Sequence, residues 1–289
     1  MRKKTFVMLL LSFVFILSAC SDEKREESAG KVHKAETEKA EETMTSSKEE
    51  SAHHDKEISE EKTSTEKVQE ETAVSTEPLY HLDENNWTIK PIGQANPKVV
   101  LLTIDDAPDT YALEMAETLK QLGAPAIFFV NGHFIDSPDK EDVLKAIHEL
   151  GFPIGNHTYS HTNLKDLSEE QQYKEIVGLN DRIEEIIGQR PKFFRAPFGS
   201  NTDYSKKVVR EEKMLFMNWT YGYDWEKDYQ TKEALTEIMI NSPYLVEGAN
   251  LLMHDREWTK DALQDIVKGL QNKGFEFVNP ELIKKADKI

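Results

Sequence analysis

The sequence predicts an α/β domain of the barrel type over residues 91–289. Seven short apolar runs alternate with amphipathic stretches of helical periodicity, which is the pattern of repeated βα units and a parallel sheet. Glycines follow several of the helical stretches, where a left-handed residue commonly ends a helix. Seven such units favour a closed or nearly closed barrel over an open doubly wound sheet.

The expected strands are the runs of apolar residues at 98–104, 125–130, 152–155, 192–195, 214–219, 249–253 and 275–278. The expected helices span 110–122, 139–150, 168–187, 203–211, 231–240 and 259–272. Ser168, followed by Glu170 and Gln171, is a candidate helix N-cap. Because function collects at the carboxyl ends of parallel strands, polar residues at these ends are the candidate site residues.

A secretory signal is predicted for residues 1–19, which begin with three basic residues, continue in an apolar run and end before Cys20. The sequence Leu17-Ser18-Ala19-Cys20 resembles a bacterial lipobox. This resemblance implies that Cys20 is lipidated and that the protein is extracytoplasmic, anchored to the cell membrane through its lipid. The alternative is an ordinary signal peptide with an incidental cysteine. Cys20 is the single cysteine, so no disulfide within the chain is expected.

Residues 20–90 are predicted to form a disordered acidic linker. Within them, residues 21–80 hold 18 acidic and 9 basic side chains, with no aromatic before Tyr80. Such a segment cannot bury enough apolar surface to fold. Residues 81–289 carry 35 acidic and 24 basic side chains, a formal net charge of -11. This charge argues against nucleic acid as a partner and is compatible with a neutral or zwitterionic glycan.

A metal site is predicted from two short motifs. Thr103-Ile104-Asp105-Asp106 follows the first strand, and His157-Thr158-Tyr159-Ser160-His161 follows the third. Two imidazoles and one carboxylate are the ligands of a catalytic zinc or similar divalent ion with open positions, here His157, His161 and Asp106. Because side chains alternate along a strand, Asp105 is expected to point away from Asp106 and to serve as general base.

Further polar residues follow the later strands: Arg195 ends the fourth, Asp224 follows the fifth and His254 follows the sixth. Ionisable side chains at successive strand ends lie close together, where like charges repel and the groups lose contact with water. Such a cost is expected where the groups serve one site. The pattern therefore favours a shared site over scattered surface polarity.

Five ordered motifs carry a resemblance to a known family: Thr-Ile-Asp-Asp, His-Thr-Tyr-Ser-His, Arg195-Ala196-Pro197-Phe198-Gly199, Asp224-Trp225 and Leu252-Met253-His254. From about residue 97 onward the chain resembles the polysaccharide deacetylases, carbohydrate esterase family four. The resemblance implies a distorted seven-stranded (β/α) barrel, the NodB homology domain, at residues 91–289. It also implies removal of N-acetyl groups from chitin-like or peptidoglycan glycans, or of O-acetyl groups from xylan.

The same resemblance implies the roles of individual residues. Asp106, His157 and His161 would bind one divalent ion, with zinc expected and cobalt, nickel and manganese as alternatives. Asp105 would take a proton from the attacking water, and Arg195 would orient this aspartate.

The remaining motifs would supply the acid and the acyl pocket. His254, held by Asp224, would protonate the amine leaving group. The backbone N–H of Phe198, in the turn that also contains Pro197, would donate a hydrogen bond to the developing oxyanion. The acetyl methyl would lie between Trp225 and Leu252.

Two alternatives and one departure stay open. The barrel could bind glycan at the surface without turnover, or apply the same chemistry to O-acetyl xylan or muramic acid. Where relatives commonly have Gly-Pro after the aspartate pair, this chain has Ala107-Pro108. If a positive φ is needed there, Ala107 is strained by about 1 kcal/mol and the access of substrate is altered.

Overall fold

The computed structural model describes residues 77–285. The predicted signal peptide, Cys20 and most of the predicted linker lie outside the described residues. Among residues 77–285, no helix has both the length and the apolar character that a bilayer crossing requires.

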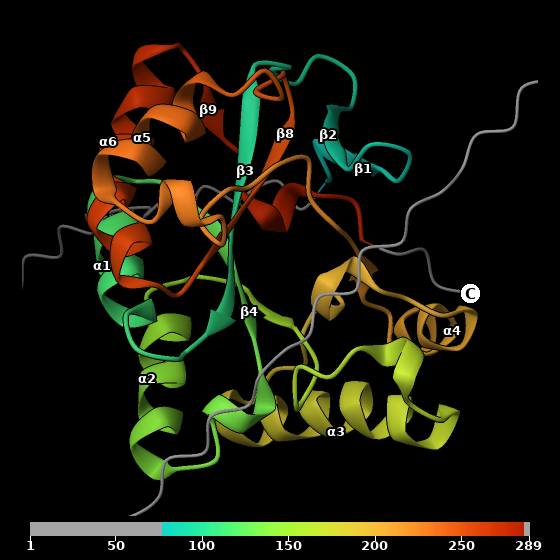
Figure 1. Ribbon diagram of the computed structural model, residues 1–289. Helices are drawn as coiled ribbons and strands as arrows, with labels where there is room; N and C mark the ends of the chain where they lie inside the picture. The colour runs from blue at the N-terminus through green and yellow to red at the C-terminus, as the bar shows by residue number, and fades with distance from the viewer. Residues whose placement is uncertain (1–76, 286–289) are drawn as a thin grey trace, which may run out of the picture. The chain divides into compact units, whose positions relative to one another are not determined.

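A parallel seven-stranded sheet forms the centre of the fold (Figure 1). Its strands lie in the order β7-β6-β5-β4-β3-β8, and β9 pairs with β3. The strands are β3 (Val99–Ala107), β4 (Ala126–Val130), β5 (Ile154–Asn156), β6 (Phe193–Phe194), β7 (Leu215–Phe216), β8 (Ala249–His254) and β9 (Glu276–Phe277). Beyond β7, a parallel bridge joins Tyr221 to Leu251 of β8 and brings the two sides of the sheet together. The predicted distorted barrel is confirmed.

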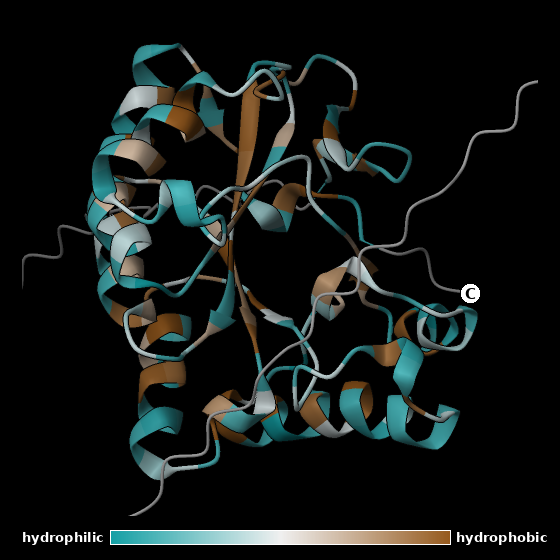
Figure 2. Cartoon of the chain, viewed as in Figure 1, coloured by the Kyte–Doolittle hydropathy of each residue, from teal (hydrophilic) through white to brown (hydrophobic). Residues whose placement is uncertain are grey.

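Within residues 77–285, six α-helices cover the sheet, and each overlaps a predicted helix within two residues at either end. They are α1 (Ala112–Gln121), α2 (Pro138–Glu149), α3 (Glu169–Ile187), α4 (Asp203–Glu211), α5 (Lys232–Asn241) and α6 (Glu257–Asn272). The predicted N-cap at Ser168 forms a capping box with Gln171, which satisfies backbone N–H groups at the start of α3. In Figure 2 the strands are largely hydrophobic, whereas the helices carry hydrophilic residues on their outer sides.

The central strand β3 is buried along its whole length. Val100, Leu102 and Ile104 pack in the cluster that the helices share. Val99 and Leu101, on the opposite face, pack with side chains from β4 and β6. A strand that is buried on both faces has a continuous apolar sequence, and this run made β3 easy to predict.

A hairpin precedes the barrel and corrects the predicted boundary at residue 90. Strands β1 (Tyr80–Asp83) and β2 (Thr88–Pro91) pair antiparallel. Tyr80 and Ile89 are buried in the cluster that contains Val99. The N–H of Ile89 donates to the carbonyl of Gly248, 2.7 Å away, in the loop before β8. Two four-residue strands are too short for a periodic signal, and packing on the barrel decides their structure.

Candidate active site

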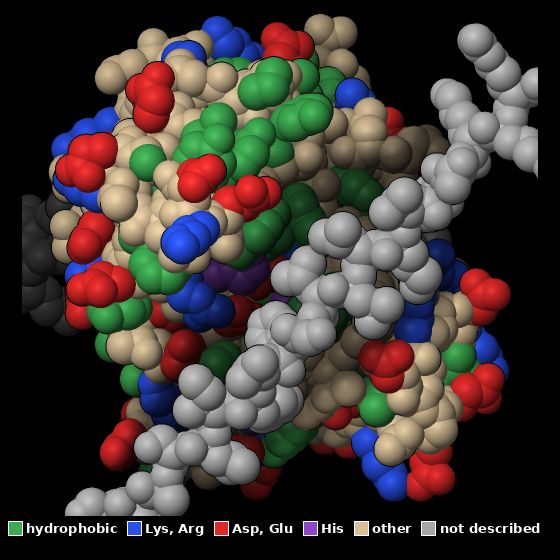
Figure 3. All heavy atoms as spheres, in the orientation of Figure 1, with side chains coloured by type: hydrophobic (Ala, Val, Ile, Leu, Met, Phe, Trp, Pro, Cys, Tyr) green, Lys and Arg blue, Asp and Glu red, His purple; other side chains and the backbone are tan. Residues whose placement is uncertain are grey.

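Most of the predicted site residues line one cavity of about 410 Å³ at the carboxyl ends of the strands. Figure 3 shows histidine side chains at the bottom of a hollow, with acidic side chains beside them. The lining residues are Asp105, Asp106, His157, His161, Ala196, Phe198, Trp219, Asp224, Trp225, Leu252, His254 and Arg256. Arg195 and Pro197 are buried and are not part of this lining.

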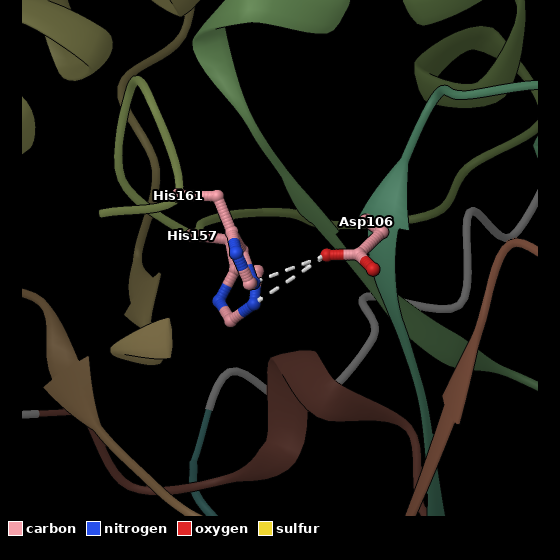
Figure 4. Close-up of side chains that lie close together, drawn as sticks. All are labelled: Asp106, His157 and His161. Atoms are coloured by element: carbon pink, nitrogen blue, oxygen red, sulfur yellow. Dashed lines mark ion pairs between the residues drawn. The ribbon is translucent and has the colours of Figure 1, made fainter. Parts of the chain in front are cut away.

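The three predicted metal ligands converge in this cavity. Oδ1 of Asp106 lies 3.4 Å from Nε2 of His161 and 3.8 Å from Nε2 of His157. Figure 4 shows both imidazoles turned toward the same carboxylate oxygen. Zinc bound tetrahedrally at about 2.0–2.1 Å separates its ligand atoms by about 3.3 Å. Small side-chain movements therefore fit this donor set to a divalent ion.

The carbonyl of Arg195 fixes the tautomer of His157. Nδ1 of His157 lies 2.7 Å from this carbonyl oxygen. Since a carbonyl can only accept, Nδ1 carries the hydrogen and Nε2 presents its lone pair to the cavity. This is the orienting contact that metal-binding histidines usually make with their second nitrogen.

The two aspartates face the same cavity, contrary to the expected alternation. Asp106 has a positive φ of 60°, and the pairing of β3 with β4 shifts register between Ile104 and Ala107. This local turn brings Oδ2 of Asp105 to 3.6 Å from Nε2 of His157. The positive φ lies at Asp106, and Ala107 is not among the described residues with positive φ. The strain expected at Ala107 is therefore absent.

Positive φ values recur around the site. Asp106, Thr158, His161 and Phe198 have φ between 59° and 69°, although none is glycine. Such conformations cost on the order of 1–3 kcal/mol each and persist where the surroundings hold them. The surroundings here include Oδ1 of Asn156, which accepts from the N–H of Thr158 at 2.9 Å.

Asp105 is held by a fully buried arginine. Nη1 of Arg195 donates to Oδ1 of Asp105 at 2.7 Å and to Oγ1 of Thr103 at 2.8 Å. Nη2 donates to the backbone oxygen of Asn218 at 3.0 Å. The second carboxylate oxygen of Asp105 faces the cavity. The expected contact between Arg195 and Asp105 is present, and it leaves one oxygen of the aspartate available for proton transfer.

His254, which is partly buried, and the fully buried Asp224 form a second pair. Nδ1 of His254 lies 2.7 Å from Oδ1 of Asp224. Oδ2 of Asp224 accepts from the N–H of His254 at 2.6 Å and from Oγ1 of Thr259 at 2.8 Å. Burial lowers the pKa of His254, but the negative charge and hydrogen bond of Asp224, with Asp105 and Asp106, outweigh it and raise the pKa.

Aromatic and apolar side chains form the walls of the cavity. Phe198 is 67% exposed and Trp225 is 45% exposed. The ring of Trp225 meets His254 edge-on, with centroids 5.6 Å apart, and Phe198 meets His161 at 5.0 Å. Exposed aromatic faces beside a polar centre suit a sugar, which presents both C–H groups and hydroxyls.

Arg256 is a lining residue that the sequence analysis missed. Its Nη2 lies 2.7 Å from Oδ2 of Asp106, and its Nη1 lies 3.6 Å from Oδ2 of Asp109. Together with His254 and the two other histidines it lowers the pKa of Asp106, although burial alone would raise that pKa. Its position directly after His254-Asp255 was the available signal.

Asp255, also missed, ties the first βα loop to β8. Its carboxylate accepts from the N–H groups of Thr110, Tyr111 and Ala112 at 3.0, 2.6 and 3.0 Å. Its own N–H donates to the carbonyl of Asp105 at 3.1 Å. An acidic side chain at the start of α1 satisfies N–H groups that the helix leaves unpaired.

Comparison with known proteins assigns the family. The sequence profile of the polysaccharide deacetylases matches residues 92–217. A peptidoglycan-N-acetylglucosamine deacetylase of Bacillus cereus is 32% identical over 191 residues, which span 62% of this chain and 68% of the relative. The chain belongs to the polysaccharide deacetylase family.

Other members of the family differ in length and in activity. The peptidoglycan-N-acetylmuramic acid deacetylase PdaC of Bacillus subtilis is 30% identical over 195 residues, 67% of this chain and 40% of the relative. The chain thus matches less than half of that protein. A solved pseudoenzyme of carbohydrate esterase family four from Bacillus anthracis has a TM-score of 0.57 and 29% identity, with 64% of each chain covered.

The contact of Arg256 with Asp106 predicts a tunable metal affinity. In Arg256→Met, Asp106 loses a competing cation, and we expect zinc to bind about tenfold more tightly. Competition with a chromophoric zinc chelator measures the dissociation constant. Arg256→Lys keeps the charge and should stay close to the parent protein. Weaker or unchanged binding by the Met variant would show that Arg256 does not compete for Asp106.

Proposed function

We propose that this chain is a metal-dependent deacetylase that removes N-acetyl groups from N-acetylglucosamine residues of peptidoglycan or a chitin-like glycan. One observation carries the proposal: a three-residue metal-ligand set, an oriented carboxylate and an oriented imidazole face the same cavity. Hydrolysis of an amide needs an activated water, a base and an acid for the amine leaving group. Each requirement has a residue in the cavity.

Asp106, His157 and His161 would hold the ion. A divalent ion bound there supplies Lewis-acid polarisation of the acyl carbonyl and activation of water. With Nδ1 of His157 donating to the carbonyl of Arg195, its Nε2 is already aimed at the site. The described residues offer one such donor set of three or more side chains. Zinc is the expected ion, and cobalt, nickel and manganese accept the same ligand types.

Asp105 is the proposed base. Arg195 fixes one oxygen of its carboxylate at 2.7 Å, so the other can accept a proton from a water molecule in the cavity. Asp105 is paired in register with His254 on the neighbouring strand β8. The proposed base and the proposed acid therefore lie at neighbouring positions of two paired strands, and both line the cavity.

His254 is the proposed acid. The contacts of Asp224 favour the imidazolium, and the raised pKa of His254 keeps its proton available near neutral pH. Nδ1 is occupied by Asp224, which leaves Nε2 to donate to the departing amine. Phe198, Trp225 and Leu252 would enclose the acetyl group, with the N–H of Phe198 as the proposed oxyanion donor.

The names of relatives support a cell-wall substrate without fixing the sugar. The Bacillus cereus relative is named for N-acetylglucosamine, whereas PdaC is named for N-acetylmuramic acid. O-acetyl xylan is a further alternative. A non-catalytic glycan-binding role is a separate alternative, and the similar pseudoenzyme shows that the fold also occurs without activity.

We further propose that the protein is a lipoprotein, anchored outside the cytoplasm through Cys20. The lipobox-like sequence before Cys20 and the acidic segment after it support this proposal. In Cys20→Ser, a bacterial host should no longer incorporate labelled fatty acid into the protein, and the protein should leave the membrane fraction. Label retained by the variant would contradict lipidation at this residue.

The deacetylase proposal predicts acetate release from N-acetylated glycans. The full chain, loaded with zinc or cobalt, is incubated with chitooligosaccharide, peptidoglycan or acetylated xylan, and acetate is quantified. Release from the first two but not from xylan is expected. Binding of glycan with no acetate under any metal would support the non-catalytic alternative.

Two variants serve as controls for this experiment. Asp105→Asn should keep the metal and lose turnover by about 10²- to 10⁴-fold, because it removes the base only. His157→Ala should lose both metal and turnover. Metal analysis of the purified variants separates the two cases, and equal metal loss in both would overturn the assigned roles.

Removal of the charge on Asp224 should alter the pH dependence. Because Asp224 helps to raise the pKa of His254, the acid is present at low pH and is lost as pH rises through that pKa. In Asp224→Asn the pKa falls, so the alkaline limb of kcat/KM should move to lower pH by about one unit or more. If the alkaline limb of kcat/KM does not move, the group whose deprotonation causes this limb is not His254.

A further inference from the structure

A second cavity, of about 780 Å³, lies beside the active cavity. We call it the basic groove. It is lined by residues of the β1–β2 hairpin, of α4, of the segment around β7 and of the end of the described chain: His81, Leu82, Glu84, Trp87, Lys165, Gly199, Asn201, Lys206, Arg210, Met214, Leu215, Phe216, Asn218, Lys284 and Lys285. Figure 1 shows the hairpin and α4 on the same side of the barrel.

The groove concentrates positive charge in an acidic domain. Five of its lining residues are lysine or arginine, and Glu84 is the single carboxylate among them. Residues 81–289 as a whole carry a net charge of -11. Within residues 77–285, the side chains of Lys165, Lys206 and Arg210 form no ion pair, and all three are exposed. Uncompensated like charges around a cavity attract an anionic ligand.

Lys285 adds a partly desolvated cation to the lining of the groove. Its Nζ donates to the carbonyl of Pro280 at 2.7 Å and lies 3.9 Å from the centre of the Phe193 ring. Burial lowers the pKa of Lys285 to about 8; Glu281 opposes this shift and Lys192 reinforces it. A nearby anion would favour the charged form of this ammonium group.

The groove and the active cavity share a wall. Phe198 lines the active cavity, and the next residue, Gly199, lines the groove. Likewise, Trp219 lines the active cavity and its neighbour Asn218 lines the groove. A polymer with one sugar in the active cavity can therefore continue into the groove across this short segment. At the far side, Trp87 and Phe216 meet edge-on at 5.2 Å and offer an aromatic surface.

We propose that the basic groove is a subsite for anionic groups, carboxylate or phosphate, carried by the glycan whose acetylated sugar lies in the active cavity. The proposal rests on the proposed glycan deacetylase function and adds a charge requirement to it. The active cavity recognises a neutral sugar, whereas the groove recognises the charged substituents next to it. Carboxylates of lactyl and peptide groups on peptidoglycan and phosphates of attached polymers share this chemistry.

Direct binding tests the groove independently of turnover. Fluorescence polarisation of the full chain at low ionic strength compares three labelled probes: neutral chitotetraose, a peptidoglycan tetrasaccharide with its peptide carboxylates, and a glycerol-phosphate oligomer. We expect an anionic probe to bind more tightly than chitotetraose and to lose this advantage as salt is added. The better of the two anionic probes identifies the source of the charge.

Neighbouring lysines on α4 provide matched variants. Lys206→Glu reverses a charge in the groove, whereas Lys207→Glu reverses an exposed lysine outside the groove lining, 3.8 Å from Glu211. Lys206→Glu combined with Arg210→Glu should weaken the anionic probe about tenfold and leave chitotetraose unchanged. Lys207→Glu should change neither by more than about twofold.

Two results would overturn the proposal: equal affinity of the parent protein for neutral and anionic probes, or equal effects of Lys206→Glu and Lys207→Glu. In an active protein, the groove variants should raise KM for peptidoglycan with kcat retained. A protein that releases no acetate can still show the charge preference in the binding measurement. Failure of the deacetylase proposal is thus distinguishable from failure of the groove.

Discussion

The buried guanidinium of Arg195 is the constraint on which the site depends. A charge removed from water costs several kcal/mol unless partners surround it. Arg195 is fully buried, and its partners come from several parts of the barrel: Asp105 and Thr103 on β3, the backbone of Asn218 after β7, and the ring of Phe129 on β4, 4.4 Å away. Satisfying this charge therefore fixes the strands relative to one another. Its carbonyl orients His157 as well, so one residue positions both the proposed base and a proposed metal ligand.

Much of this arrangement could be predicted from the sequence because the signals are local. Helix periodicity, terminal glycines and continuous apolar runs located the βα units, and parallel topology then placed the polar residues that follow the strands at one edge. The contacts of Arg195 with Asp105 and of Asp224 with His254 were expected from the resemblance to the polysaccharide deacetylases, and both are present. The direction in which the side chain of Asp106 points could not be predicted in this way. The expected alternation of side chains assumes a regular strand, and the positive φ at Asp106 interrupts that regularity.

The features that were missed depend on tertiary contacts. The β1–β2 hairpin gains its stability from the end of the barrel, so two strands of four residues gave no pattern of their own. Arg256 meets Asp106 across 150 positions of sequence. The basic groove likewise collects lysines from separate segments, and a net charge for the whole domain hides such a local excess. Charge location, unlike charge total, is a property of the folded chain.

The hairpin also covers one end of the barrel. Tyr80 bridges to Ile283, and Ile89 packs with Val99 at the start of β3, so the chain joins the barrel at the end opposite the catalytic residues. The amino end of the barrel is thus buried under the chain's own hairpin, whereas the carboxyl end carries the cavity and is accessible to a polymer.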